Sequence, residues 1–461
     1  RGRRIGAVLM SLEQTDILVR KGKIAAIGTS LAVPSDALVI DAKGKHITPG
    51  LVDAHSHTAV KGGANEGTSS VTAEVRIGDV VDATDINIYR ELAGGLTSAN
   101  LLHGSANTIG GQNHVIKLRW GSDADGLKQV GAKPGIKFAL GENVKQSNWG
   151  PGFSRYPQTR MGVEQILRDG FLAARRYQAE RDAWKKNPKP HTEPRRNYQL
   201  DTLVEILKGE RVVHIHSYRA DEILMFSQLA REFGIKVGTF QHVLEGYKVA
   251  DAIKATGAGA STFTDWWAYK MEVQDAIPYN GAMLAKAGVV TSFNSDSNEL
   301  ARRLNTEAAK AVKWGGLSET DALNMVTINP AKQLGIDGHT GSLEVGKDAD
   351  FVIWSTNPLS TQARAEQTWI DGRQYFSIDK DLQLRQQAEQ ERTRLIAKAL
   401  PARLSAMGKS KDGAESSSTK SVRAPVDSGK AYLVLQEWLD HMANKHRSYG
   451  AGDHQNHCVE E

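Results

Sequence analysis

The chain has 461 residues, a formal charge of +5 and 40% hydrophobic residues. This length suits one large domain with a smaller one, and the hydrophobic share excludes wholesale disorder. Basic residues are scattered among acidic ones without a basic stripe, which argues against a nucleic-acid partner. No run approaches 18 apolar residues, so no membrane span is expected.

The single cysteine, Cys458, excludes an internal disulfide and a cysteine-based zinc site. The first residue is Arg1, which we interpret as the start of a processed or trimmed chain whose leader, if it had one, is already removed. Neither feature decides whether the protein is cytoplasmic or exported. The sequence also leaves open whether the protein forms a homo-oligomer.

Residues 1–50 contain short alternating segments separated by glycines, which predict a small antiparallel sheet. From 51 to 337, apolar strand-like segments alternate with amphipathic helices, a pattern typical of βα units and a parallel sheet. The expected strands after the first lie at 96–102, 135–140, 211–216, 235–240 and 289–296. A run of about 280 residues of this kind suits a closed (β/α)₈ TIM-like barrel.

The pattern returns to strands at 338–378. We therefore expect this segment and residues 1–50 to share one small β-sandwich domain, interrupted by the barrel. Residues 379–461 predict a C-terminal extension, with a polar helix at 379–400 and a low-complexity segment at 408–420. The overall prediction is an α/β fold with a composite β-domain and a C-terminal extension.

The strongest chemical signal is TPGLVDAHSHTAV at 48–60, where an apolar strand leads to His55 and His57. Residues two apart on a strand point to the same side, so both imidazoles share one face. Neutral imidazole is a common ligand for zinc and similar divalent ions. This segment therefore predicts half of a metal site.

The segment PGLVDAHSH (49–57) is similar to the first-strand signature of the amidohydrolase superfamily, and GSLEVGKDADFVIW (341–354) resembles its closing β-domain motif. LAGGLTS (92–98) and TINPAKQLGI (327–336) resemble the imidazolonepropionase- and prolidase-related branch. The resemblance implies a small-molecule substrate and a divalent metal, zinc being expected, with one or two ions per chain and two favoured. It also implies ligands at the ends of strands one, four, five, six and eight.

On the fifth strand, His214 and His216 share one face, so alternation alone does not separate them. Barrel sites lie at the carboxyl ends of strands, which favours His216 and leaves His214 as a deeper histidine. His242 follows the sixth strand. Asp296 follows the eighth and is expected to bind metal and relay protons, with a helix N-cap as its alternative role.

On the fourth strand, Ile136, Phe138 and Leu140 would share the helix-facing side, and Lys137 would face the lumen. The resemblance implies a bridging ligand here, either a carboxylated lysine or a glutamate. We favour Lys137, because a carbamate would convert a buried cation into an anionic ligand. Glu142, at the strand's end, is the alternative.

Tyr218 and Arg219 directly follow the fifth strand and are candidates for substrate binding. A phenol could steady an oxyanion, and a guanidinium could hold a carboxylate, although Arg219 could equally pair with Asp221. His114 is a further candidate for lining the pocket, as is His103. For both of these, the alternative is a hydrogen-bonded loop histidine.

Together these residues predict a metal-dependent hydrolase of amide or cyclic amide C–N bonds, in a dipeptide, an N-acyl amino acid or a lactam-like molecule. Metal-activated hydroxide would attack the carbonyl carbon, and Asp296 would carry the proton to the leaving nitrogen. The alternatives are a mononuclear deaminase, a lactone or phosphoester hydrolase, and a non-catalytic barrel scaffold.

Overall fold

The computed structural model describes residue 12 and residues 14–145, 155–188, 192–264 and 269–412. The chain divides into two units, the first running to Ser377 and the second beginning at Ile378. The extension beyond 412, including most of the expected low-complexity segment, lies outside the described residues. Within the described ranges, no helix combines the length and the apolar character that crossing a bilayer requires.

The first unit is built on strands that pair in parallel. Strands β4 and β5 pair with each other, and β8, β9, β10, β11 and β12 pair in that order. Their bounds are β4 Leu51–Ser56, β5 Leu96–Leu101, β8 Gly135–Ala139, β9 Val212–Ser217, β10 Val237–His242, β11 Gly259–Thr262 and β12 Thr291–Phe293. The expected strands are thus confirmed, and β11 is an addition.

An antiparallel segment stands between the two parallel groups. Strand β7 (His114–Lys117) pairs with β5, and β6 (Ile109–Gln112) pairs with β8, both antiparallel. The expectation of parallel strands throughout is wrong here. A parallel pair is usually joined by a helical crossover, and the segment that joins β5 to β7 contains β6 and no helix.

The described strands do not form one closed ladder, because β4 and β12 belong to different sheets. Single backbone hydrogen bonds still connect β4 to the chain that follows β12. Asp296 N donates to His55 O (3.1 Å), and Val52 N donates to Val326 O (2.9 Å). The α/β architecture is therefore as expected, while full closure of the barrel stays a prediction.

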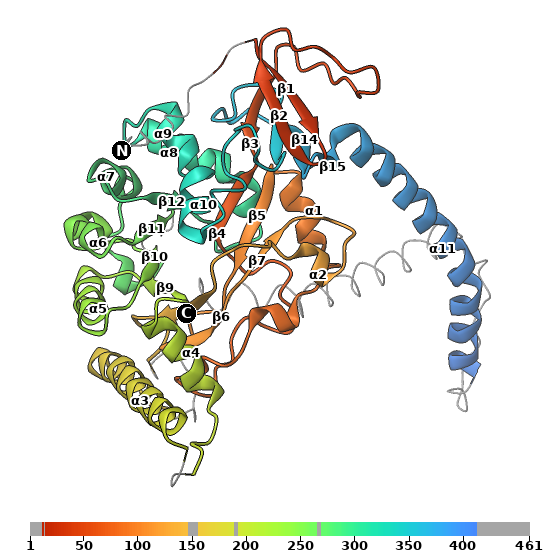
Figure 1. Cartoon of the computed structure of the whole chain (residues 1–461). Helices are drawn as coiled ribbons and strands as arrows, with labels where there is room; N and C mark the ends of the chain where they lie inside the picture. The colour runs from red at the N-terminus through yellow and green to blue at the C-terminus, as the bar shows by residue number, and fades with distance from the viewer. Residues whose placement is uncertain (1–11, 13, 146–154, 189–191, 265–268, 413–461) are drawn as a thin grey trace. The chain divides into compact units, whose positions relative to one another are not determined.

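Helices α5, α6 and α7 lie along the outer side of strands β9–β12 (Figure 1). The helices of the first unit are α1 Ile86–Leu92, α2 Ala124–Leu127, α3 Arg160–Lys186, α4 Tyr198–Leu207, α5 Ala220–Phe233, α6 Ala250–Thr256, α7 Asn280–Lys286, α8 Leu304–Lys313, α9 Glu319–Asn324 and α10 Ile328–Leu334. On β8, the Phe138 ring packs against Phe171 of α3 and Phe226 of α5. The predicted helix-facing side of this strand is confirmed, which leaves Lys137 on the opposite side.

The two flanks of the barrel segment meet in one sheet, where β3 (His46–Pro49) pairs antiparallel with β13 (Phe351–Trp354). Strands β14 (Ala365–Ile370) and β15 (Arg373–Ser377) complete this sheet, while β1 (Asp16–Arg20) and β2 (Lys23–Gly28) form a separate hairpin. Ile24 of the hairpin packs in one apolar cluster with Phe351 and Ile353. These contacts support our proposal that 1–50 and 338–378 form one β-domain.

A buried ion cluster ties the C-terminal flank to β7. The Lys117 ammonium lies 2.7 Å from Asp348, 3.0 Å from Asp350 and 2.6 Å from Asp371, and its side chain is 1% exposed. The three carboxylates lie close enough together to suggest a cation site. The cations of Lys117, Lys23 and Arg119 already pair with these carboxylates, so we assign the cluster a structural role.

The second unit begins with α11 (Ile378–Asp412), which covers the helix predicted at 379–400 and extends past its predicted end.

Candidate metal centre

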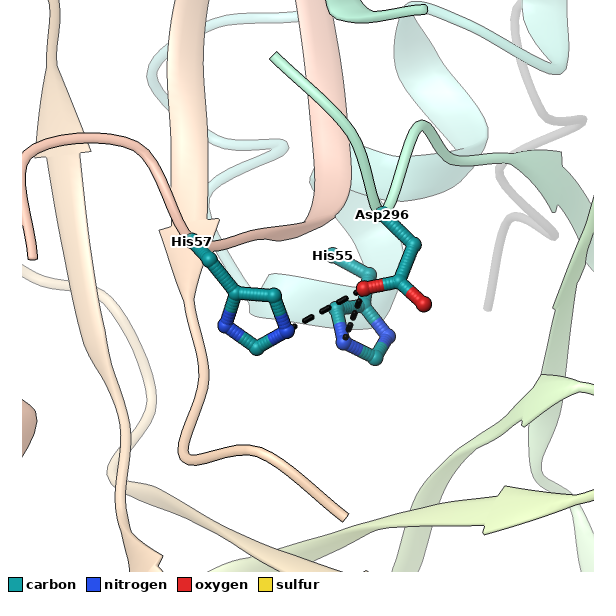
Figure 2. Close-up of side chains that lie close together, drawn as sticks. All are labelled: His55, His57 and Asp296. Carbon is teal, nitrogen blue, oxygen red and sulfur yellow. Dashed lines mark ion pairs between the residues drawn. The ribbon is translucent and has the colours of Figure 1, made fainter. Parts of the chain in front are cut away.

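The two histidines that end β4 face the carboxylate that follows β12 (Figure 2). The Nε2 atoms of His55 and His57 lie 3.3 and 3.1 Å from Asp296 Oδ1. His242 Nε2 lies 3.7 Å from Asp296 Oδ2. Three segments far apart in sequence thus bring three imidazoles around one carboxylate.

Two of these residues have a backbone conformation that side chains rarely adopt. On β10, Phe240 packs against Phe226 of α5, and strict alternation would place His242 on the same outer side. His242 has φ +64° instead, and its ring lies 4.8 Å from the His55 ring. Asp296 has φ +46°. Such strain typically occurs where a functional geometry is imposed on the chain.

The structure separates the two histidines of β9. The His216 ring lies 4.6 Å from the His242 ring, and its Nδ1 is 2.9 Å from Ser105 Oγ. His214 contacts Thr239 instead, with Nδ1 2.8 Å from Oγ1. The geometry therefore supports His216 as the ligand, in agreement with the position at the carboxyl end of the strand.

We expect His216→Ala to remove most of the bound metal, because it deletes a ligand. His214→Ala should lower metal affinity by ~10-fold or less, the effect of a group behind the ligands. The measurement is metal content after dialysis against a weak chelator. The assignment is wrong if His214→Ala strips the metal and His216→Ala retains it.

Lys137 reaches the same cluster from β8. Its Nζ lies 3.3 Å from His55 Nε2 and 3.3 Å from His103 O, and the residue is fully buried. Glu142 lies beyond the strand's end and is half-buried, where its backbone N–H donates to Glu272 Oε2 (3.0 Å). The geometry favours Lys137 over Glu142 as the fourth-strand ligand.

Burial keeps the imidazoles neutral and the carboxylate charged. Burial lowers the pKa of His55 and His216 well below the usual 6.5 and lowers the pKa of His242 to about 3. Burial also raises the pKa of Asp296, but the contacts with His57 and His242 outweigh it and hold that pKa below 3.8. Neutral imidazoles with an ionised carboxylate are the donor set that zinc and related ions bind.

Several buried atoms of the cluster fit a bound ion. His216 Nε2 and both ring nitrogens of His242 have no hydrogen-bond partner among the described residues. Buried polar atoms are rarely left without partners, because their desolvation is then uncompensated. An ion held by these nitrogens and by Asp296 would supply the missing partner.

Asp53, in the first-strand motif, holds the backbone beside two of the candidate ligands, His55 and Asp296. Its buried carboxylate accepts from the backbone N–H groups of His55 and Ser295 (both 3.1 Å) and from Ser295 Oγ (2.5 Å). Burial raises its pKa to about 7. Asp53 thereby connects the end of β4 to the residue before Asp296.

The sequence pattern identified Tyr218 as a candidate but missed its neighbours Tyr269 and Lys270. The Tyr218 ring lies 4.3 Å from the His216 ring, and its hydroxyl accepts from the Tyr269 hydroxyl (2.7 Å). Lys270 Nζ lies 4.8 Å from the centre of the Tyr218 ring. Tyr269 and Lys270 follow β11, whose sequence GAST is too small and polar to signal a strand.

Other candidates lie away from the cluster or are already engaged. Arg219 forms a two-point pair with Asp221 (3.0 and 3.1 Å) at the start of α5, which is the alternative that its sequence position allowed. His103 is held between the Glu66 N–H and Gly104 O (both 2.9 Å). His114 is half-buried on β7, and the charges that influence its pKa belong to Asp79, Asp125 and Lys128, not to the cluster.

Buried neutral imidazoles, a carboxylate and a lysine at the carboxyl ends of barrel-type strands define the kind of centre found in metal-dependent hydrolases. The model of the amidohydrolase family matches residues 46–380, and the chain belongs to this family. The family is metal-dependent and its members share a TIM-barrel fold.

Relatives are consistent with this assignment. An amidohydrolase of Hapsidospora irregularis, tasK, is 31% identical over 78% of this chain, which spans only 40% of that relative's length. An imidazolonepropionase of Vibrio cholerae is 23% identical over 74% of this chain and 87% of its own length. A solved amidohydrolase from Thermotoga maritima is 33% identical, with a TM-score of 0.72 over 78% of this chain and 94% of that one.

Proposed function

We propose that this hydrolase cleaves an amide or cyclic amide C–N bond in a small molecule. The observation that carries the proposal is the convergence of three buried imidazoles, those of His55, His57 and His242, on Asp296. The His216 ring joins them 4.6 Å from the His242 ring. Relatives named amidohydrolase and imidazolonepropionase support C–N hydrolysis as the reaction class.

The proposed ligands of the divalent metal, zinc being expected, are His55, His57, His216, His242 and Asp296. When bound, the metal lowers the pKa of water toward ~7 and polarises a carbonyl group. Lys137 would complete a two-ion site as a carbamate, in which Nζ forms a bond to the carbon of carbon dioxide and loses a proton. Its ammonium form would instead repel the metal and favour a single ion.

Asp296 has two oxygens with different surroundings, which suits a proton relay. Oδ1 lies between the imidazoles of His55 and His57, while Oδ2 faces His242 at 3.7 Å. As an ionised carboxylate it can accept the proton of the attacking water and return it to the leaving nitrogen. The Tyr218 phenol, in ring contact with His216, is placed to donate to the developing oxyanion.

The Lys270 ammonium favours a substrate that bears a carboxylate, such as a dipeptide or an N-acyl amino acid. Its ammonium is bonded to Asn143 Oδ1 (2.7 Å) and paired with Glu272 Oε1 (3.1 Å), and its side chain is 9% exposed. Its charge lowers the pKa of His216 and His242, so its field reaches the metal centre. An ammonium carries three N–H donors, and a substrate carboxylate can share them.

We expect K270M to lower kcat/KM for an N-acyl amino acid about tenfold or more relative to the matching N-acyl amino acid amide, the size of one hydrogen bond to a charged group. K248M is the control, since Lys248 pairs with Glu245 and Asp275 on the outer side. If K270M keeps the wild-type ratio of kcat/KM for the acid over the amide, Lys270 does not bind the substrate carboxylate.

The experiment that tests the reaction class is a hydrolysis screen on zinc-loaded protein. The substrates are dipeptides, N-acyl amino acids and lactams, with lactones and phosphoesters as the comparison. The proposal predicts that C–N substrates give the highest kcat/KM. Preferential hydrolysis of a lactone or phosphoester, or release of ammonia as a deaminase would produce, would contradict it.

A further inference from the structure

Three polar side chains are buried behind His55, and each is at most 1% exposed. His55 Nδ1 lies 3.3 Å from Gln241 Oε1, Gln241 Nε2 lies 2.6 Å from Thr239 Oγ1, and Thr239 Oγ1 lies 2.8 Å from His214 Nδ1. Thr239 and His214 are register partners on β10 and β9. A continuous line of hydrogen bonds therefore runs from the candidate ligand to the histidine that the metal centre does not use.

The chemistry of these groups fixes the direction of the hydrogen bonds that Gln241 makes. Gln241 Nε2 also faces the carbonyl oxygen of Ala54 (3.4 Å), which can only accept. The amide oxygen therefore faces His55, and His55 Nδ1 must donate to it. The amide nitrogen donates to Thr239 Oγ1. The Thr239 hydroxyl can donate to His214 Nδ1 or accept from it, because it has one proton and two lone pairs. The contacts of Gln241 thus assign the proton of His55 to Nδ1.

We propose that Gln241, Thr239 and His214 are positioning residues that fix the tautomer and orientation of His55, so that its Nε2 lone pair faces the metal. This inference rests on the proposed function, because it assigns support to one of the proposed ligands. Partners of this kind hold the ring orientation of a metal-binding histidine and raise its basicity. The proposal also gives His214 a role that its position below the centre otherwise leaves unexplained.

Two of the other candidate ligands, His57 and His216, are held by shorter contacts. His57 Nδ1 faces the backbone oxygen of Leu102 (2.9 Å), and His216 Nδ1 faces Ser105 Oγ (2.9 Å). A side-chain relay behind His55 therefore makes its orientation sensitive to substitutions on β10. The same substitutions should not change the orientation of the His57 and His216 rings.

The first test measures zinc affinity by chelator competition in full-length Q241L, T239V and T262V. We expect Q241L to weaken binding ~10–100-fold and T239V to weaken it by several-fold, ~10-fold at most. T262V is the matched control, since Thr262 is a fully buried threonine on β11 that also accepts from an amide side chain, that of Asn280 (3.1 Å). Q241E should restore affinity relative to Q241L, because it keeps the acceptor for His55.

In the Q241L background, T239V should have no further effect on zinc affinity, because the chain is already broken at Gln241. Equal losses of affinity in Q241L, T239V and T262V would overturn the proposal, since they would reflect general loosening of the fold.

The second test needs no metal and separates this proposal from the proposed function. In metal-free protein with nitrogen-15-labelled histidine, NMR should show His55 protonated on Nδ1, with its signal assigned by its loss in the H55N variant. Protonation of His55 on Nε2 would overturn the proposal. A wild-type protein that binds no zinc but shows this tautomer of His55 would contradict the proposed function and leave the hydrogen-bond chain supported.

Discussion

D296N is expected to keep its fold and part of its metal but to lose turnover by ~10²–10⁴-fold, the usual share of a positioned acid–base group. The amide has nearly the size of the carboxylate and can still offer one oxygen to a metal. It cannot accept a proton at neutral pH, where Asp296 is ionised because its pKa is held below 3.8. D296A should lose metal as well, because it removes the shared partner of the imidazoles.

The measurement is zinc content and kcat for both variants on the best substrate from the screen. Zinc content distinguishes a lost ligand from a lost proton relay. A D296N variant with near-native kcat would place the relay on another group, with His242 the next candidate, since the structure puts His114 away from the cluster.

K117M is expected to destabilise the protein by about 3–5 kcal/mol, the cost of removing one partner from a buried ion cluster. The substitution removes the cation that Asp348, Asp350 and Asp371 share at the contact between β7 and the C-terminal flank. Asp348 and Asp371 keep Lys23 and Arg119 as partners, whereas the buried Asp350 loses the cation it pairs with. The measurement is the free energy of unfolding in urea. Lys23 provides the control, since it pairs with Asp348 from a half-exposed position and K23M should cost about 1 kcal/mol or less.

The same cluster predicts a dependence of stability on pH. Burial lowers the pKa of Lys117, but the charges of Asp350 and Asp371 outweigh it and raise that pKa above the usual 10.5. A raised pKa in the folded state means that this stabilisation is fully present below pH 10.5 and is lost as the pH rises through the folded value. The wild-type protein should therefore remain more stable than K117M until the pH rises above the raised pKa of Lys117, in strong alkali. Equal stability of the two proteins at pH 7 would contradict the role of the cluster.

Alternation along strands predicted much of the centre from sequence. His55 and His57 share a face because they are two apart on β4, and the same rule placed Lys137 opposite Phe138. Alternation failed at His242, where a positive φ turns the ring inward, because backbone strain has no signature in a single sequence.

Residues whose roles depend on long-range contacts could not be predicted. Lys270 lies after a strand with no apolar pattern, and its place beside Tyr218 depends on how that loop folds back. Gln241 and Thr239 do share the lumen-facing side of β10, and this periodicity was available in the sequence. What the sequence lacked was the partner across the lumen, His55, which only the packing of β4 opposite β10 supplies.

If a metal held by this cluster drives C–N hydrolysis, the rate of hydrolysis must follow the occupancy of the cluster. Zinc is titrated into metal-free protein, and release of free amine from the preferred amide substrate is followed at each occupancy. We expect amine release to be absent without zinc, to rise in proportion to occupancy up to one or two ions per chain, and to stay absent in the H55A variant. Amine release that is independent of zinc occupancy, or its absence from every amide substrate at full occupancy, would contradict zinc-dependent C–N hydrolysis.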